Sequence, residues 1–355
     1  MNTQQSTAAT ARHAPPADRS DATIDVVCAA DDAYAMPLAV TLKSACRNLA
    51  KGSRIRLFFI TGGINDANWS MIEATLADEP IDIHVIQPDR AIFADLTISH
   101  HISHTAYFRL LTAELLPSDV RRVIYLDSDL FIQEDLGHLW ALPIEAKFCL
   151  ATVDVACPYV DARLGCANYR MANPYMASLS PIRNYRELGL DGSSEYFNSG
   201  VMVLNLDLWR KEEMATRLLK TLRDNQKYVW CWDQYALNVA CHGNWGRFDP
   251  RWNQGAHVFE YPSARHAPIE VNQWDQMRTD PAIVHFTTEF KPWQHNSNHP
   301  RSEVFYEGLD ETAWRGWRPD TSRSNFKDWF NRQVLAAIKQ ATISSRRLTS
   351  MWAAG

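Results

Sequence analysis

The sequence predicts an α/β fold in which a parallel, doubly wound sheet carries helices on both faces. β-rich apolar runs alternate with segments whose apolar residues recur at helical spacing, the pattern of strands joined by crossover helices. The 355 residues are 46% hydrophobic and 22% charged, so the chain can bury a large core. We expect one elaborated domain over residues 23–311, between a disordered segment at 1–22 and a tail at 312–355.

The first elements form a β-α-β-α-β series. Each strand is a short run rich in β-branched and aromatic residues, and Asp66 can cap the second helix. The expected strands are 24–30, 54–60 and 81–86, and the expected helices are 36–49 and 67–76. Such a series implies parallel strands whose carboxyl ends meet at one edge, where ligands bind in doubly wound sheets.

The next strand, Arg122–Ile132, presents two carboxylates. Asp127 and Asp129 are two residues apart, so their side chains point the same way and can close on one divalent cation. The pair alone is a weak signal, because an Asp-x-Asp arises by chance about once in a chain of this length. The preceding helix, 103–116, carries Arg109, which is either a surface charge or a clamp for phosphate or carboxylate.

The second half of the chain continues the alternation. A strand ends in Asp154, and residues 155–190 form a long region without periodicity, typical of a functional loop or lid. Asn198 and Ser199 precede a buried strand, where they either bond a ligand's hydroxyl groups or open a turn. A charged amphipathic helix is expected at 211–227.

Two later residues have a structural and a functional interpretation. Asp233 lies near the start of a helix, where capping is its ordinary role. His285 ends a strand and is followed by Lys291, and a histidine in such a place is more often structural than a ligand.

Composition excludes several classes of protein. The net charge of -5 argues against a general nucleic-acid binder, which usually carries a basic footprint. The 7 Cys include no Cys-x-x-Cys pair, so we expect buried, reduced thiols in a cytoplasmic protein. The N-terminus has no apolar core of a signal peptide, and no run approaches the roughly 18 apolar residues of a membrane span. Any membrane contact should therefore be peripheral.

The tail is basic. From Trp314 onward eight Lys and Arg residues stand against two Asp, although the whole chain is acidic. Phe326, Trp329 and Ile338 fall on one helical stripe with other apolar residues. A basic amphipathic helix with aromatic residues suits an anionic membrane face, where each cation contributes about 1 kcal/mol. The alternative is a helix packed on the main domain.

Six motifs follow one another in a recognisable order. They are Ala29-Ala30-Asp31-Asp32, His101–Leu110, Tyr125-Leu-Asp-Ser-Asp129, Phe197-Asn-Ser-Gly200, Asp233-Gln234 and His285 with Lys291-Pro-Trp293. Their joint order resembles glycosyltransferase family 8, in particular the bacterial lipooligosaccharide and lipopolysaccharide α-galactosyl- and α-glucosyltransferases. The resemblance extends over residues 24–300.

The resemblance implies a GT-A fold, a Rossmann-like nucleotide-binding sheet, that transfers a hexose from a UDP-sugar with retention of anomeric configuration. It implies that Asp127, Asp129 and His285 bind Mn²⁺, with Mg²⁺ as the other option. A cation held in this way keeps positions open for diphosphate oxygens and neutralises charge on the departing UDP. It also implies that Lys291 contacts the diphosphate and that Asp31 faces uridine.

The resemblance also indicates the reacting centre. Asp233 and Gln234 are the catalytic candidates nearest the reacting carbon. Because an amide is a poor nucleophile and no carboxylate clearly matches, a front-face displacement is favoured over a covalent intermediate. The residues expected to bind the nucleotide sugar are Ala30, Asp31, Arg109, Ser128, Asp154, Asn198, Ser199, Thr288 and Lys291.

Two positions depart from the family pattern. Ala33 stands where relatives often carry an Asn that contacts the uracil. Thr288 replaces a glycine, so it must either adopt an awkward backbone conformation or bond the phosphate through its hydroxyl.

The resemblance suggests a lipid-linked glycan acceptor, the lipopolysaccharide core, and a protein on the inner face of the cytoplasmic membrane. A protein or small-molecule acceptor is the first alternative. A metal-dependent phosphohydrolase or nucleotidyltransferase is the second, but it would need further carboxylates for another metal. The sequence does not decide between glucose and galactose as the transferred sugar.

Overall fold

The computed structural model describes residues 22–93, 104–288, 290–295, 297–319, 334, 337–338 and 340–347. The predicted disordered segment, apart from Ala22, lies outside the described residues, as do Phe326 and Trp329 of the predicted tail stripe.

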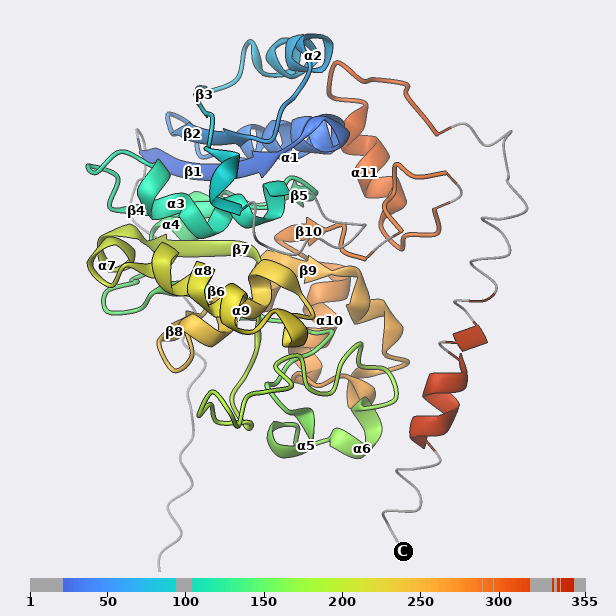
Figure 1. The fold of residues 1–355 in the computed structure, drawn as a ribbon. Helices are drawn as coiled ribbons and strands as arrows, with labels where there is room; N and C mark the ends of the chain where they lie inside the picture. Colours follow the sequence, from blue (N-terminus) through green and yellow to red (C-terminus); the bar gives the residue numbers. More distant parts are fainter. Residues whose placement is uncertain are drawn as a thin grey trace, which may run out of the picture.

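The main sheet has seven strands in the order β3-β2-β1-β4-β7-β6-β8 (Figure 1). β1 pairs with β2 and β2 with β3, all parallel, as predicted from the β-α-β-α-β series, and β1 is also parallel to β4 on its other side. The strands are β1 Thr23–Ala30, β2 Arg54–Thr61, β3 Ile81–Ile86, β4 Arg122–Leu126, β6 Cys149–Val153, β7 Phe197–Asn205 and β8 Trp245–Arg247. The α/β fold is confirmed.

The sheet is mostly parallel, as predicted, and β7 is the exception, since it is antiparallel to both of its neighbours, β4 and β6. The connection from β6 to β7 contains α5 and α6, which have only four residues each, too short for a crossover along the sheet. The chain therefore enters β7 beside the end of β6, where Phe197 pairs with Val153.

A small second sheet has the order β5-β10-β9. Its strands are β5 Leu130–Ile132, β9 Gln254–Gly255 and β10 Ile283–His285. The single strand expected over Arg122–Ile132 is thus two strands in different sheets, and the turn between them holds Asp127 and Asp129. The chain changes sheet at its two carboxylates.

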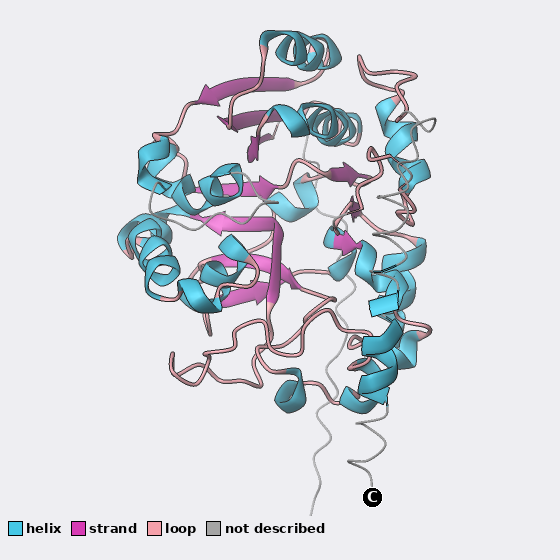
Figure 2. Ribbon diagram, turned by 45° about the vertical axis from the view of Figure 1, so that its right-hand side comes forward, coloured by secondary structure: helices cyan, strands magenta, loops and turns pink. Residues whose placement is uncertain are grey.

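Helices cover both faces of the main sheet (Figure 2). Side chains alternate along β1, so Val27 and Ala29 pack with α3, α7, α8 and α9, whereas Val26 and Cys28 pack with α1 and α2. The α-helices are α1 Ala35–Arg47, α2 Asp66–Leu76, α3 Thr112–Leu115, α4 Gly137–Trp140, α5 Ala162–Gly165, α6 Tyr169–Ala172, α7 Leu206–Lys211, α8 Met214–Asp224, α9 Trp232–Ala240, α10 Val271–Thr279 and α11 Ser302–Leu309. The 3₁₀ helices are η1 Asp32–Tyr34, η2 Arg90–Phe93, η3 His104–Leu111, η4 Gln226–Tyr228, η5 Pro250–Asn253, η6 Ala256–Glu260 and η7 Ala264–His266.

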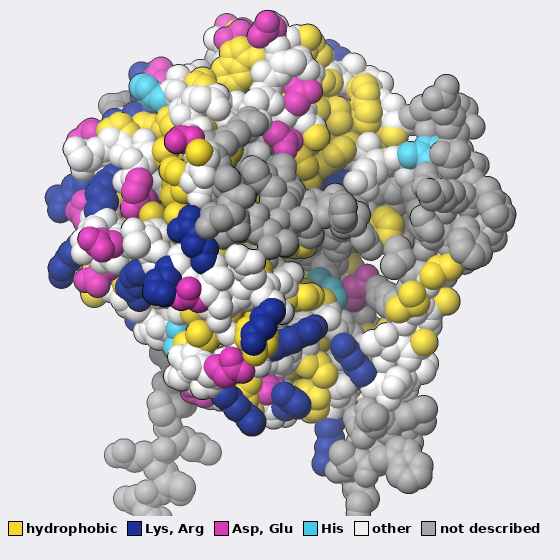
Figure 3. Space-filling model, viewed as in Figure 1, with side chains coloured by type: hydrophobic (Ala, Val, Ile, Leu, Met, Phe, Trp, Pro, Cys, Tyr) yellow, Lys and Arg dark blue, Asp and Glu magenta, His cyan; other side chains and the backbone are white. Residues whose placement is uncertain are grey.

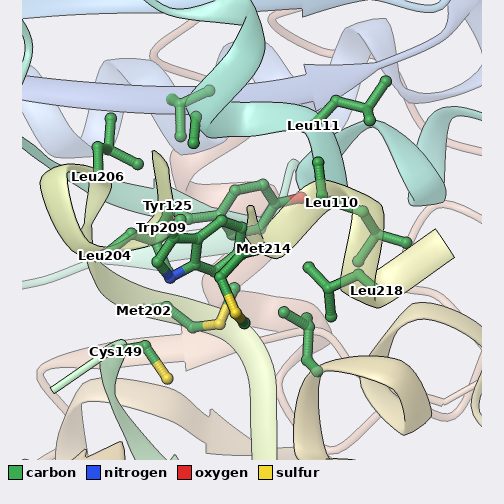
Figure 4. Close-up of a cluster of buried hydrophobic side chains, with 14 of the residues drawn as sticks. Leu110, Leu111, Tyr125, Cys149, Met202, Leu204, Leu206, Trp209, Met214 and Leu218 are labelled. Atoms are coloured by element: carbon green, nitrogen blue, oxygen red, sulfur yellow. The ribbon is translucent and has the colours of Figure 1, made fainter. Parts of the chain in front are cut away.

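Trp209 lies in the core between the sheet and α8 (Figure 4). Met202, Met214 and Leu218 surround it in the same cluster, all fully buried. A buried indole N–H needs a partner, and Nε1 of Trp209 donates to the carbonyl of Phe148 at 2.9 Å. Side chains of β4 and β7, the strands that lead into the site, belong to the same cluster.

Two predicted helices differ from the structure. The helix predicted at 103–116 is described from His104 and is a 3₁₀ helix up to Leu111, followed by the short α3. The helix predicted at 211–227 corresponds to α8, which begins only at Met214, and to the short η4 after it. Glu213 adopts a left-handed conformation with φ +50° and separates α8 from α7. This break lets Trp209 and Met214 both enter the core.

The cysteines agree with the prediction of reduced thiols. All seven are free, and six are buried, whereas Cys231 is half-buried. The six buried thiols belong to the hydrophobic core clusters.

The first residues of the predicted tail pack on the domain. The backbone N–H of Ala313 donates to Oγ1 of Thr75 at 3.0 Å, and Arg318 pairs with Asp310 at 2.7 Å. The helical residues 340–347 reach the loop after α6, where Arg346 donates to the carbonyl of Met176 at 2.7 Å. Among the described residues, no helix has the length and apolar character needed to cross a membrane.

Candidate active site

Asp127, Asp129 and His285 meet where the main sheet adjoins the small one. β4 ends just before the two carboxylates, and β10 pairs antiparallel with β5 so that His285 lies opposite Leu130. Nε2 of His285 is 3.3 Å from Oδ1 of Asp129 and 3.6 Å from Oδ2 of Asp127. The topology therefore brings together residues that are far apart in the sequence.

The geometry of these three side chains fits a single divalent cation. One ligand atom from each lies within 4.8 Å of the others. Metal–oxygen distances of about 2.1–2.6 Å place neighbouring ligand atoms at about this spacing. Two carboxylates and an imidazole suit a hard or borderline ion and leave coordination positions for other oxygens. Within the described residues this is the one cluster of three such groups close enough to share an ion.

Gly200 makes room for the cluster. It lies in β7, and the backbone N–H of Asp127 donates to its carbonyl at 2.8 Å. A Cβ at this position would lie 2.3 Å from Cε1 of His285 and 2.8 Å from Oδ2 of Asp127. The predicted turn before a strand is thus part of β7 itself, and its glycine is required by the close approach of two side chains.

Lys291 adds a cation at the edge of the cluster. Its Nζ donates to Oδ2 of Asp129 at 2.6 Å and to the carbonyl of Phe286 at 2.7 Å. Burial alone would raise the pKa of Asp129, but Lys291 and His285 hold that pKa below its ordinary value. Asp129 is therefore an ionised carboxylate, as a metal ligand must be.

Thr288 has a strained backbone, with φ +80°. A β-branched residue rarely adopts this conformation, whereas glycine does so without cost. The awkward conformation expected from the sequence is thus present. The side chain of Thr288 is exposed, between His285 and Lys291 along the chain.

Arg109 is buried, which excludes the interpretation as a surface charge. Its guanidinium donates to Oδ1 of Asp127 at 2.7 Å and forms an ion pair with Oδ2 of Asp233 at 2.8 Å. A third contact is to the carbonyl of Ser199 at 2.9 Å, and the guanidinium lies 4.5 Å from the centre of the Tyr125 ring. Only a planar, multidentate cation can serve these partners together.

The charges around Arg109 change the pKa values of the groups. Burial alone would lower the pKa of Arg109, but Asp127 and Asp233 raise it, so the guanidinium stays protonated. Burial raises the pKa of Asp233 to about 6, with Arg109 acting in the opposite direction. Asp233 lies in the first turn of α9, where a carboxylate suits the helix dipole, and it also pairs with Arg109, whereas the N-cap residue is Cys231.

Gln234 and Asp154 form a second polar group on the other side of β7. Nε2 of Gln234 donates to Oδ2 of Asp154 at 2.9 Å, and the backbone N–H of Ser199 donates to Oε1 of Gln234 at 3.1 Å. The same carboxylate oxygen of Asp154 accepts from Nδ2 of Asn198 at 3.1 Å. Both ends of the Gln234 amide are thus engaged.

A cavity of about 180 Å³ adjoins the carboxylates at the end of β1. Its lining includes Ala30, Asp31, Tyr34, Arg109 and Ser128. Among the described residues, the buried Oδ1 of Asp31 has no hydrogen-bond partner. A buried carboxylate oxygen without a donor is costly, so this atom is available to a ligand that brings an N–H.

The structure thus brings the candidate site residues into one region, whereas Thr288 is placed only by its position in the chain and His101–Ser103 of the second motif lie outside the described residues. Two residues at and after the end of the first motif do not join this region. Asp32 accepts hydrogen bonds from Asn65 and Asn68 and so joins η1 to α2. Ala33 is exposed.

Sequence reasoning missed Tyr34 and Asn253, which lie in the cavity wall and beside His285 respectively. It also assigned no steric role to Gly200, although a glycine inside a buried strand is a signal of close approach. Nothing in the sequence around Asn253 distinguishes it from an ordinary loop residue.

Known proteins agree with this arrangement. The model of glycosyl transferase family 8 matches residues 25–297. General stress protein A of Bacillus subtilis is 26% identical over 299 residues, which cover 83% of this chain and 96% of that protein. Lipopolysaccharide 1,2-glucosyltransferase of Escherichia coli is 23% identical over 222 residues, which cover 62% of this chain and 59% of that protein.

Solved structures share the fold. The galactosyltransferase LgtC, in complex with donor and acceptor sugar analogues, matches with a TM-score of 0.64 and 24% identity, covering 87% of this chain and 99% of that one. An active-site mutant of LgtC matches with a TM-score of 0.66 and 25% identity, covering 84% and 99%. The expected GT-A fold is therefore confirmed, and because the family model spans most of the chain, this protein belongs to glycosyltransferase family 8.

Proposed function

We propose that this glycosyltransferase moves a hexose, glucose or galactose, from a UDP-sugar to a glycan acceptor, with retention of anomeric configuration. The observation that carries the proposal is the cluster of Asp127, Asp129 and His285, which lies beside the cavity and Arg109. A cluster of this kind beside a cavity with an unpaired carboxylate oxygen suits a metal-bound diphosphate attached to a base.

Asp127, Asp129 and His285 would hold Mn²⁺ or Mg²⁺. Such an ion, when bound, neutralises the charge that develops on the departing diphosphate. Lys291 adds positive charge at the same place, and Thr288 presents an exposed hydroxyl nearby in the chain. These two residues would contact diphosphate oxygens.

Asp31 would recognise the uracil ring. Its unpaired Oδ1 can accept from an imide N–H, and Tyr34 and Ala30 line the same cavity. Ser128 would complete the nucleotide contacts from the turn between the two carboxylates.

The hydrogen bonds around the reacting centre favour a front-face displacement over a covalent intermediate. An amide is a poor nucleophile, and a carboxylate held in an ion pair is a weaker nucleophile than a free one. Asp233 is paired with Arg109, and Oε1 of Gln234 accepts from Ser199. We infer that these residues, with Asp154, Asn198 and Arg109, bind the sugar and orient it while the leaving phosphate oxygen helps to deprotonate the acceptor.

The acceptor proposed is a lipid-linked glycan of the lipopolysaccharide core, reached from the inner face of the cytoplasmic membrane. Similarity to the E. coli lipopolysaccharide glucosyltransferase supports this choice. The exposed Val334 and Ile338 of the tail add support, since exposed apolar side chains in a basic segment suit an anionic bilayer surface. In Figure 3, Lys and Arg side chains also gather on the lower half of the molecule, among apolar ones.

The experiment that tests the function is hydrolysis of UDP-glucose and UDP-galactose by the purified protein, with and without Mn²⁺. We expect UDP release from one of the two sugars, dependent on the metal. Release of phosphate from nucleotides in place of UDP from UDP-sugars would favour a phosphohydrolase. Trapping of a glycosyl-enzyme with the sugar on Asp233 or Gln234, detected by mass spectrometry, would overturn the front-face mechanism.

A further inference from the structure

Asn253 connects the candidate metal cluster to the sugar-side residues. It ends η5 and is only 5% exposed. Its Oδ1 lies 2.8 Å from Nδ1 of His285, and its Nδ2 donates to Oδ1 of Asn198 at 2.9 Å. Either the oxygen or the nitrogen of the Asn253 amide could face His285, and the hydrogen bonds around the amide decide which one does.

Asn198 has one permitted orientation, for two independent reasons. Its Nδ2 faces Oδ2 of Asp154 at 3.1 Å, and a carboxylate oxygen that also receives the amide of Gln234 acts as an acceptor. Its Oδ1 accepts from the backbone N–H of Gly200 at 2.9 Å, and a backbone N–H can only donate. The nitrogen of Asn198 therefore faces Asp154, and its oxygen faces Asn253.

The orientation of Asn198 fixes that of Asn253 in turn. Since Oδ1 of Asn198 is an acceptor, the group of Asn253 that faces it must be the donor Nδ2. The remaining end of the amide, Oδ1, then faces His285 and accepts from its ring. Nδ1 of His285 must carry a proton, which leaves the lone pair of the neutral ring on Nε2.

Nε2 is the nitrogen that points to the carboxylates, 3.3 Å from Asp129 and 3.6 Å from Asp127. We propose that Asn253 is a positioning residue that holds His285 in the Nδ1–H tautomer and so presents Nε2 as the metal-binding atom. The inference rests on the proposed function, since it requires that the cluster binds a divalent cation.

The hydrogen-bond network of Asn253 extends beyond the imidazole of His285. From His285 they pass through Asn253 and Asn198 to Asp154, the carboxylate that also holds Gln234. Partners of this kind orient metal ligands, and their removal typically costs about 10–100-fold in metal affinity. The residues proposed to hold the sugar thus help to orient the metal cluster.

Two substitutions separate the tautomer effect from a loss of packing. Asn253→Ala removes the acceptor for Nδ1–H. Asn253→Asp keeps an acceptor of the same shape for Nδ1–H, but it loses the donor to Asn198 and adds a negative charge. We expect Mn²⁺ affinity, measured by electron paramagnetic resonance without any substrate, to fall about 10–100-fold in Asn253→Ala. We expect it to be retained in Asn253→Asp, because a carboxylate is an ordinary hydrogen-bond partner of a metal-binding histidine. Asn184→Ala is the matched control, because Asn184 is equally buried and bonds Asn225 and Tyr235.

Nitrogen-15 chemical shifts of the His285 ring give a second readout that needs no variant. In the metal-free wild-type protein, at a pH where the ring is neutral, we expect the pattern of a proton on Nδ1, and in Asn253→Ala a mixture of tautomers. A wild-type ring with its proton on Nε2 would overturn the proposal, even if the variants failed to fold. Equal affinity of Asn253→Ala and wild type would also overturn it, as would equal losses in the Ala and Asp variants. Failure of the wild-type protein to bind Mn²⁺ would instead refute the proposed function.

Discussion

The substitution Gly200→Ala adds one methyl group at the centre of the candidate metal cluster. The new Cβ would lie 2.3 Å from Cε1 of His285 and 2.8 Å from Oδ2 of Asp127, whereas ordinary contact begins at 3.4 Å. The imidazole would have to retreat by about 1 Å to relieve this overlap. It has little freedom to do so, because it is 5% exposed and bonded to Asn253.

The expected effects of Gly200→Ala follow from that displacement. Overpacking costs about 1–3 kcal/mol of folding free energy, and a misplacement of about 1 Å at a reacting centre lowers the rate about 100-fold. We expect metal affinity to fall about 10–100-fold, because His285 and Asp127 can no longer approach the same ion. The assays are Mn²⁺ titration by electron paramagnetic resonance and Mn²⁺-dependent release of UDP, on protein whose thermal unfolding has been measured.

Gly316→Ala is the control for a loss of stability alone. Gly316 is exposed, has φ +79° and lies where an added Cβ meets nothing within 4 Å. This variant should unfold at a lower temperature and bind Mn²⁺ as wild type does. A Gly200→Ala protein with wild-type metal affinity would refute the steric argument and the placement of His285.

Three further changes test other parts of the structure. Arg109→Lys should lower UDP release about 100-fold, since one ammonium cannot bridge Asp127 and Asp233 as the guanidinium does, and wild-type turnover by this variant would refute the bridging role. Thr288→Gly should raise the unfolding temperature, because relief of the positive φ is worth about 1 kcal/mol and the side chain is exposed. A lower unfolding temperature would contradict the strain. Deletion of residues 320–355 should abolish binding to anionic liposomes while UDP-sugar hydrolysis persists. If the shortened protein still bound liposomes, the tail would not be the segment that attaches the protein to the membrane.

The sequence predicts the elements that depend on local pattern. The alternation of side chains along β1 and the short β-rich runs predict the first three strands, and the parallel pairing of β1 with β2 follows from their crossover helix. Asp127 and Asp129 could be paired from their spacing alone. The break between β4 and β5 could not be predicted from the sequence, because β5 pairs with β10, which is more than a hundred residues away in the chain.

The residues that were missed or left undecided depend on tertiary contacts. Arg109 has the sequence environment of an exposed helical cation, yet the fold buries it between a carboxylate just after β4 and one in α9. Asp233 has the position of a helix cap, yet its partner comes from η3. Asn253 acts only because η5 packs beside β10, which brings its amide to His285. Sequence pattern predicts elements, whereas these side-chain partners require the assembled fold.

The central claim is that Asp127, Asp129 and His285 bind one divalent cation that the transfer of a hexose requires. Its most direct measurement compares wild type with Asp129→Ala for Mn²⁺ binding and Mn²⁺-dependent UDP-sugar turnover, with Asp224→Ala as an exposed acidic control. We predict one Mn²⁺ per wild-type chain, and loss of both binding and turnover only in Asp129→Ala. Undiminished turnover in Asp129→Ala, or turnover by the wild-type protein after removal of all divalent metal, would contradict the account.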